Sequence, residues 1–174
     1  MRLPRPAILP LLLLTLLLAA CAGDISKPVA VKSLDIAAKA DLRVTDITGE
    51  NRQGVVMTPS DIDRITEQVR AEIAGKFPNA LAAATVGTTT ARIKIVFTQY
   101  DEGNAFARFM LAGLGQIRID GDVLLLAADS DIVLAQYQVS KQFAFGGLYG
   151  GTTTIRDVEK GFAKSVAEVL NDKL

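Results

Sequence analysis

The chain has 174 residues, 19 basic and 19 acidic side chains, no His, no Trp and one Cys. Without His there is no imidazole base and no His-ligated metal site, and a single Cys cannot form an intrachain disulfide or a Cys-rich metal cluster. The balanced charge lacks the basic excess that is typical of nucleic-acid-binding proteins.

The first 20 residues have the pattern of a cleaved signal peptide. Two Arg residues come first, and an apolar run over residues 7–18 follows them. A helix of this length spans about 18 Å, which is too short for a hydrocarbon core of about 30 Å but typical of a secretory signal. We therefore expect residues 1–20 to be removed from the mature protein.

The signal ends in Leu18-Ala19-Ala20-Cys21, which resembles the lipobox of bacterial lipoproteins. In such proteins the Cys thiol receives a diacylglycerol, cleavage occurs just before it, and the new amine is acylated. The resemblance implies a covalent lipid on Cys21, membrane anchoring without a transmembrane helix, and no other cofactor. Ala22 rather than Asp follows the Cys, which by the same resemblance favours the periplasmic face of the outer membrane. The alternative is a secretory signal that contains a Cys by chance.

The sequence after the signal divides into a tether and one domain. Residues 21–39 combine Gly, Pro, Lys and small apolar side chains, so we expect a short lipidated tether that keeps the domain close to the bilayer. Residues 40–174 are enough for a single core without a disulfide or a metal. The first element expected in this domain is a strand over residues 40–48, where apolar and polar residues alternate.

Two amphipathic helices are predicted. The first begins at residues 58–61, where a capping Thr, a Pro and an acid follow one another, and its apolar side chains recur at 62, 65, 69 and 73. The second begins at Thr154, with Asp157 as its partner in a capping box, and runs nearly to the end of the chain.

Three further strands are expected between the two helices, over residues 92–100, 116–127 and 132–145. The last two flank an Asp-Ser-Asp turn, which is a hairpin signal. The resulting order β-α-β-β-β-α predicts an α+β fold, a two-layer sandwich of a mixed or antiparallel sheet and two helices.

The segment between the second and third strands is unusually apolar for a Gly-flanked connection. One interpretation is that it folds over the sheet or begins the next strand. The other is an exposed patch for a partner or the bilayer, with an Arg as its polar anchor. The candidate partner-binding residues are Phe106, Arg108, Phe109 and Met110.

A second candidate is the Gly-rich loop before the last helix, because a strand, such a loop and a helix together form the usual context of a phosphate cradle. Thr152 stands where a nucleotide-binding loop requires Lys, so we expect no nucleotide. The loop is either a flexible connection or a site for a small ligand or glycan. The candidate ligand-binding residues are Gly146, Gly147, Gly150, Gly151 and Thr152.

Carboxylates offer weaker candidates. The pairs 120/122 and 129/131 lack the further acids of a calcium loop, so we expect no metal site. Asp101 and Glu102 are adjacent on an extended chain and point in opposite directions, which does not suit acid and base catalysis on one bond. We therefore expect no enzymatic activity, with a carboxylate-based hydrolase as the minor alternative.

Taken together, these features are similar to a family of small proteobacterial lipoproteins known only as a domain of unknown function, over roughly residues 30–172. More loosely, the layout resembles the N-terminal domain of TolB and the lipoprotein activators of cell-wall synthases. The resemblance implies a fold and a location but no catalytic residues. It is carried by the lipobox, Asp41-Leu42-Arg43-Val44, the capped helix, Arg108 before Gly113-x-Gly115, the hairpin, and Gly146-Gly147 with Gly150-Gly151.

The function expected from the sequence is that of a lipid-anchored, non-enzymatic accessory domain that binds an envelope protein partner. The alternative from a different class is a periplasmic module that binds a small ligand or a glycan at residues 146–151.

Overall fold

The computed structural model describes residues 27–111, 114–144 and 151–171. One layer is a five-stranded sheet in the order β1-β5-β4-β3-β2. Only β2 and β3 are parallel, and the other neighbouring strands are antiparallel. The strands are β1 (Val29–Lys32), β2 (Leu42–Asn51), β3 (Thr89–Asp101), β4 (Ile117–Ala127) and β5 (Val133–Phe143).

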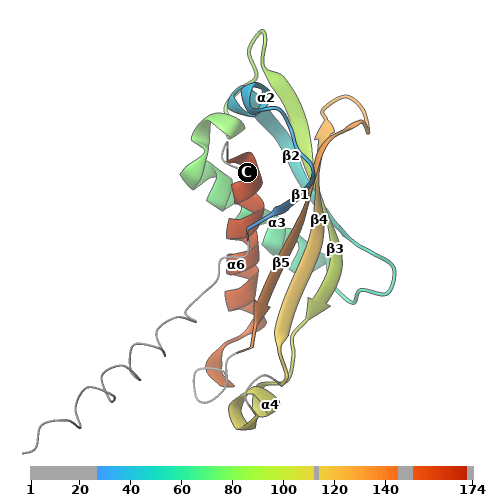
Figure 1. Ribbon diagram of the computed structural model, residues 1–174, viewed down its shortest axis with the longest axis vertical. Helices are drawn as coiled ribbons and strands as arrows, with labels where there is room; N and C mark the ends of the chain where they lie inside the picture. Colours follow the sequence, from blue (N-terminus) through green and yellow to red (C-terminus); the bar gives the residue numbers. More distant parts are fainter. Residues whose placement is uncertain (1–26, 112–113, 145–150, 172–174) are drawn as a thin grey trace, which may run out of the picture.

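The second layer consists of two helices that cover one face of this sheet, α3 (Pro59–Lys76) and α6 (Ile155–Ala167) (Figure 1). The predicted α+β sandwich is therefore confirmed. Within the described residues, no helix has both the length and the apolar character needed to cross a bilayer. The shorter helices are α2 (Ile36–Ala40), η2 (Pro78–Leu81), α4 (Ala105–Met110) and η3 (Glu168–Leu170).

Alternation along the strands builds the core between these layers. Side chains at every second position of β3 and β4 are buried, while those between them lie on the face without helices. The rings of Phe97 on β3 and Phe162 on α6 lie 5.7 Å apart. Gly121 makes room for this pair, because a Cβ there would lie 3.1 Å from the Phe162 ring.

Both long helices begin where the sequence predicts. The Thr58 hydroxyl accepts a hydrogen bond from the Asp61 amide (3.2 Å), and the Asp61 carboxylate accepts one from the Thr58 amide (3.0 Å). Thr154 and Asp157 form the same capping box at the start of α6. Each box satisfies amide groups that would otherwise lack partners at a helix N-terminus.

Three elements lie where the sequence predicts none. The strand β1 and the helix α2 fall within residues 21–39 and 36–40, so the folded domain begins earlier than the expected boundary at residue 40. The helix α4 occupies the connection between β3 and β4. The four side chains of β1 are exposed and its partner strand is distant in the sequence, so no local pattern reveals it.

Candidate functional site

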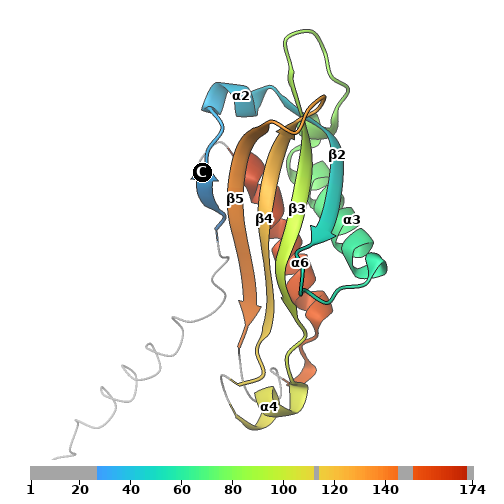
Figure 2. The same ribbon diagram turned by 90° about the vertical axis from the view of Figure 1, so that its right-hand side faces the viewer.

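The helix α4 stands alone at one end of the molecule (Figures 1 and 2). It connects the last residue of β3 to the start of β4, and Asp101 pairs with Arg118 at the base of this connection. The strand β5 ends at the same level, because Phe143 is the register partner of Ile117. The opposite end of the sheet carries the β4–β5 turn and the loop that precedes β3.

Two glycines form the neck that holds α4. Gly103 and Gly115 have φ values of 63° and 68°, in the region that favours glycine. A Cβ on Gly103 would lie 2.3 Å from the carbonyl oxygen of Gly115, so the two segments meet backbone to backbone. The Asn104 amide donates to the Gly115 carbonyl (3.2 Å), and the Asn104 side chain caps α4 by accepting from the Ala107 amide (2.9 Å).

Arg108 fixes α4 on this neck. Its side chain is 3% exposed although it lies at the tip of the molecule. The guanidinium donates to the carbonyl oxygens of Gly115 (2.7 Å), Thr153 (3.0 Å) and Glu102 (3.3 Å). Because Thr153 directly precedes the cap of α6, these bonds join α4 to both neighbouring segments of the chain.

The apolar residues around Arg108 point away from the protein. We define the apolar cap as the exposed side chains of Phe106 (74%), Phe109 (49%), Met110 (58%), Leu111 (55%) and Leu114 (56%). Half of the large exposed apolar side chains in the described part of the chain belong to this cap. Surface apolar residues that occur singly are ordinary, whereas a cluster of this kind marks an interaction site.

The structure assigns different roles to the residues that the sequence singled out. Phe106, Phe109 and Met110 are exposed together, as the interaction hypothesis requires. The expected role of Arg108 needs correction, because its guanidinium is buried on backbone carbonyls and is not presented to a partner. Leu111 and Leu114 complete the cap and were missed, although both continue the apolar run in the sequence.

The Gly-rich loop is described only in part. Gly146, Gly147 and Gly150 lie outside the described residues. Gly151 lies against α4, since a Cβ on it would be 3.3 Å from the Cβ of Phe109. Thr152 is exposed beside it. The described end of the loop thus supports α4, and the two candidate sites meet at Phe109 and Gly151.

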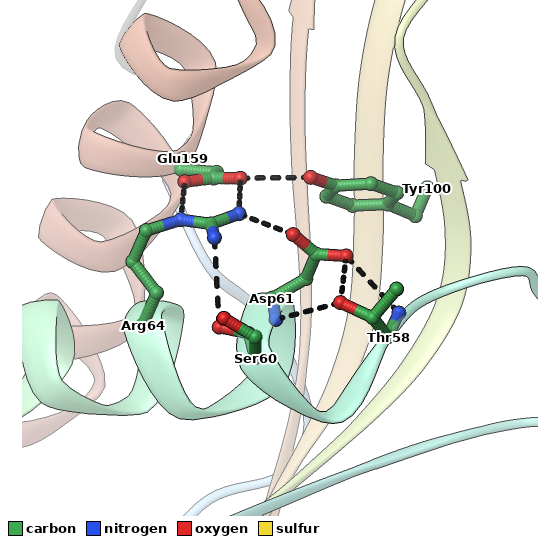
Figure 3. A network of polar contacts seen from close by, with 6 residues as sticks. All are labelled: Thr58, Ser60, Asp61, Arg64, Tyr100 and Glu159. Atoms are coloured by element: carbon green, nitrogen blue, oxygen red, sulfur yellow. Dashed lines mark hydrogen bonds and ion pairs between the residues drawn. The ribbon is translucent and has the colours of Figure 1, made fainter.

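A buried polar network joins α3, α6 and β3 (Figure 3). Glu159 is fully buried and accepts two hydrogen bonds from Arg64, at 2.8 and 2.7 Å. The Tyr100 hydroxyl donates to the same carboxylate at 2.8 Å. Arg64 also binds Asp61 at 2.6 Å, which connects the network to the capping box of α3. The sequence reading missed Glu159, which adjoins the apolar stripe of α6.

The network shifts the pKa values of its members. The hydrogen bond from Thr58 and then that from Arg64 lower the pKa of Asp61 to about 2. Hydrogen bonding to Glu159 raises the pKa of Arg64 above its ordinary value. Burial, followed by the bond to Glu159, raises the pKa of Tyr100. These shifts keep both carboxylates paired with the guanidinium, which suits a strut between the two layers.

The family model described as a domain of unknown function, DUF4410, matches residues 30–147. The chain belongs to the DUF4410 family. The resemblance to a family known as a domain of unknown function is thereby confirmed. The looser similarities to the TolB domain and to the synthase activators remain predictions. A search of the curated proteins finds no match.

Solved structures also resemble this DUF4410 domain at low identity. The PelC dodecamer from Paraburkholderia phytofirmans is 11% identical with a TM-score of 0.49, covering 79% of this chain and 92% of that one. A variant of that protein gives 10%, 0.47, 83% and 94%. A presumed lipoprotein from Caulobacter crescentus CB15 gives 15%, 0.35, 76% and 86%. Likeness at this level carries no information on function.

The acidic pairs of the DUF4410 domain are bound by its own side chains. Asp120 accepts hydrogen bonds from Arg118 (2.7 Å) and Ser140 (2.6 Å). Asp122 pairs with Arg52 (2.7 Å). At the neck, the Asp101 carboxylate accepts a hydrogen bond from the Gly103 amide (2.8 Å). These contacts use the carboxylates to stabilise the sheet face and the neck.

Proposed function

We propose that this protein is a lipid-anchored, non-enzymatic accessory protein of the cell envelope that docks through its apolar cap. The observation that carries the proposal is the combination of a buried Arg108 with an exposed apolar cluster around it. An apolar segment that served only as a linker would gain by folding onto the core. Here the neck and the guanidinium hold it away from the core, so that Phe106 and Met110 face outward.

The non-enzymatic part of the proposal rests on how the carboxylates are used. The buried Glu159 is occupied by Arg64 and Tyr100, and Asp120 and Asp122 are paired with arginines. General acid and base catalysis needs carboxyl groups that converge on a substrate with suitably separated pKa values. The ligand-binding alternative draws no support from Gly151, which packs against Phe109.

Cys21→Ser tests the anchor. The lipobox hypothesis predicts an unprocessed precursor in cells, whereas the wild-type chain matures and takes up labelled palmitate. Sucrose-gradient fractionation of the wild-type protein then separates the outer membrane from the inner membrane. Normal maturation of Cys21→Ser would overturn the anchor.

Photo-crosslinking in cells tests docking. A photoreactive amino acid replaces Phe109 in the cap, and the matched control carries it at Ile132, which is 65% exposed at the opposite end of the sheet. We expect adducts with an envelope component, protein or lipid, from position 109 in large excess over position 132. Equal labelling from the two positions would show that the cap is not a docking surface.

A further inference from the structure

We propose that the apolar cap inserts into the interfacial layer of the same bilayer that holds the lipid on Cys21. The domain then stands on the membrane through two attachments, the lipid and the cap. This inference rests on the proposed function, because it requires the anchor at Cys21.

The direction of β1 is the first argument. Val29 pairs with Gln138 and Lys32 pairs with Gln136, so β1 runs away from the end of the sheet at which β5 stops. Followed backwards, the chain therefore leaves β1 towards Phe143, which is level with the start of β4 and the neck of α4. Figure 2 shows β1 beside β5 with α4 beyond the far end of the same strand.

The position of Lys27 supports this direction. Its side chain lines a groove together with Arg118, Asp120 and Ser140. Ser140 lies on β5 beyond Gln138, the partner of Val29, and nearer to the cap. The chain has thus already moved towards the cap by the first residue that the structure describes.

The length of chain between Lys27 and the anchor fits the distance that remains. Six residues lead from Lys27 back to Cys21, and extended chain spans at most about 3.5 Å per residue, or roughly 20 Å. Three residues separate Ser140 from Phe143 and three separate Leu114 from Ile117, which together correspond to about 20 Å at strand spacing. Cys21 can therefore reach the level of the cap but not extend far beyond it.

The chemistry of the cap favours lipid over protein as its occupant. Residues 105–114 contain one charged side chain, Arg108, and its guanidinium is turned inwards. A protein interface normally combines an apolar centre with a polar rim and hydrogen bonds, whereas insertion at a bilayer interface needs only exposed apolar groups. Asp101, Glu102 and Arg156 are exposed behind the cap, at the depth of the lipid headgroups in this arrangement.

The test uses the absence of Trp from the chain, which makes any introduced Trp a unique fluorophore. The lipidated, mature protein with Phe106→Trp is reconstituted into vesicles of phosphatidylethanolamine and phosphatidylglycerol containing a dibrominated phosphatidylcholine. The matched control is Val86→Trp, a fully exposed position at the opposite end of the sheet. Both sites are exposed, so neither substitution disturbs the core, and far-UV circular dichroism verifies folding.

We expect a blue-shifted emission and about two-fold quenching by the brominated lipid at position 106, and neither effect at position 86. Adding Phe109→Asp to the Phe106→Trp chain is expected to abolish the quenching while the lipid keeps the protein on the vesicle. Equal quenching at positions 106 and 86 would overturn the inference. If the cap then still crosslinks to an envelope protein in cells, the proposed function stands without it, and if it crosslinks to nothing, both fall.

Discussion

Replacement of Arg108 by Met removes the guanidinium that holds α4 while keeping a side chain of similar length. The bonds to Gly115 and Thr153, at 2.7 and 3.0 Å, are the shorter of the three bonds to carbonyl groups. Hydrogen bonds that involve a charged group each contribute about 1.5–3 kcal/mol. Taking about 1.5 kcal/mol for each of these two gives a loss of roughly 3 kcal/mol in the free energy that keeps α4 closed.

Hydrogen exchange of the α4 amides measures this loss directly. The amide of residue 108 donates to the Asn104 carbonyl, and that of Leu111 to the Ala107 carbonyl. Since 1.4 kcal/mol corresponds to a tenfold change, we expect these amides to exchange up to about 10²-fold faster in Arg108→Met. Arg108→Lys, which keeps the charge but not the planar group, should fall between the two.

Arg118→Met is the matched control. Arg118 is also paired, with Asp120, but its side chain is 43% exposed on the open face of the sheet. We expect its removal to change the stability by less than about 1 kcal/mol and to leave α4 exchange unaltered. If α4 amides exchanged at wild-type rates in Arg108→Met, the role of the guanidinium as the fixing group would be refuted.

Three further outcomes are expected. Glu159→Gln should lower the free energy of unfolding in urea by about 3 kcal/mol, because it leaves Arg64 without its buried counter-charge; a loss below about 0.5 kcal/mol would contradict the strut. Gly103→Ala should speed α4 exchange, whereas Gly54→Ala, also at positive φ but in open space, should not; equal behaviour would remove the backbone contact from the account. The folded-state pKa of Asp61 is about 2, below its ordinary value of 3.8, so its stabilisation is present above pH 3.8 and lost as the pH falls towards 2. Asp61→Asn should flatten urea-measured stability across that window, and an unchanged acid limb would exclude Asp61 as its source.

Local signals explain why so much of the fold follows from the sequence. The capping pair Thr58 and Asp61 and the apolar spacing after it define α3 without reference to any other segment. The hairpin of β4 and β5 is likewise written in alternation around a short turn. By contrast, β1 exists because β5 offers it an edge, and its four exposed residues carry no pattern of their own.

The candidate site was predictable in composition but not in orientation. The run of Phe, Met and Leu between residues 106 and 111 indicates an apolar cluster in any conformation. Whether Arg108 points outward depends on Thr153, which is 45 residues away, and on a backbone contact between Gly103 and Gly115. Such acceptors are backbone carbonyls, which leave no mark on residue type. The same distance hides Glu159 from Arg64.

The pairing of β1 with β5 also sets an order of events during export. The first strand of the domain can form its hydrogen bonds only after residues 136–138 have emerged, about a hundred residues later. Contacts of this sequence separation form late, since a long loop must close before they are gained. Until then the segment before β1 has no fixed point of departure from the domain. The acylated terminus and the folded body therefore acquire their mutual orientation in one step, when the sheet closes on its own beginning.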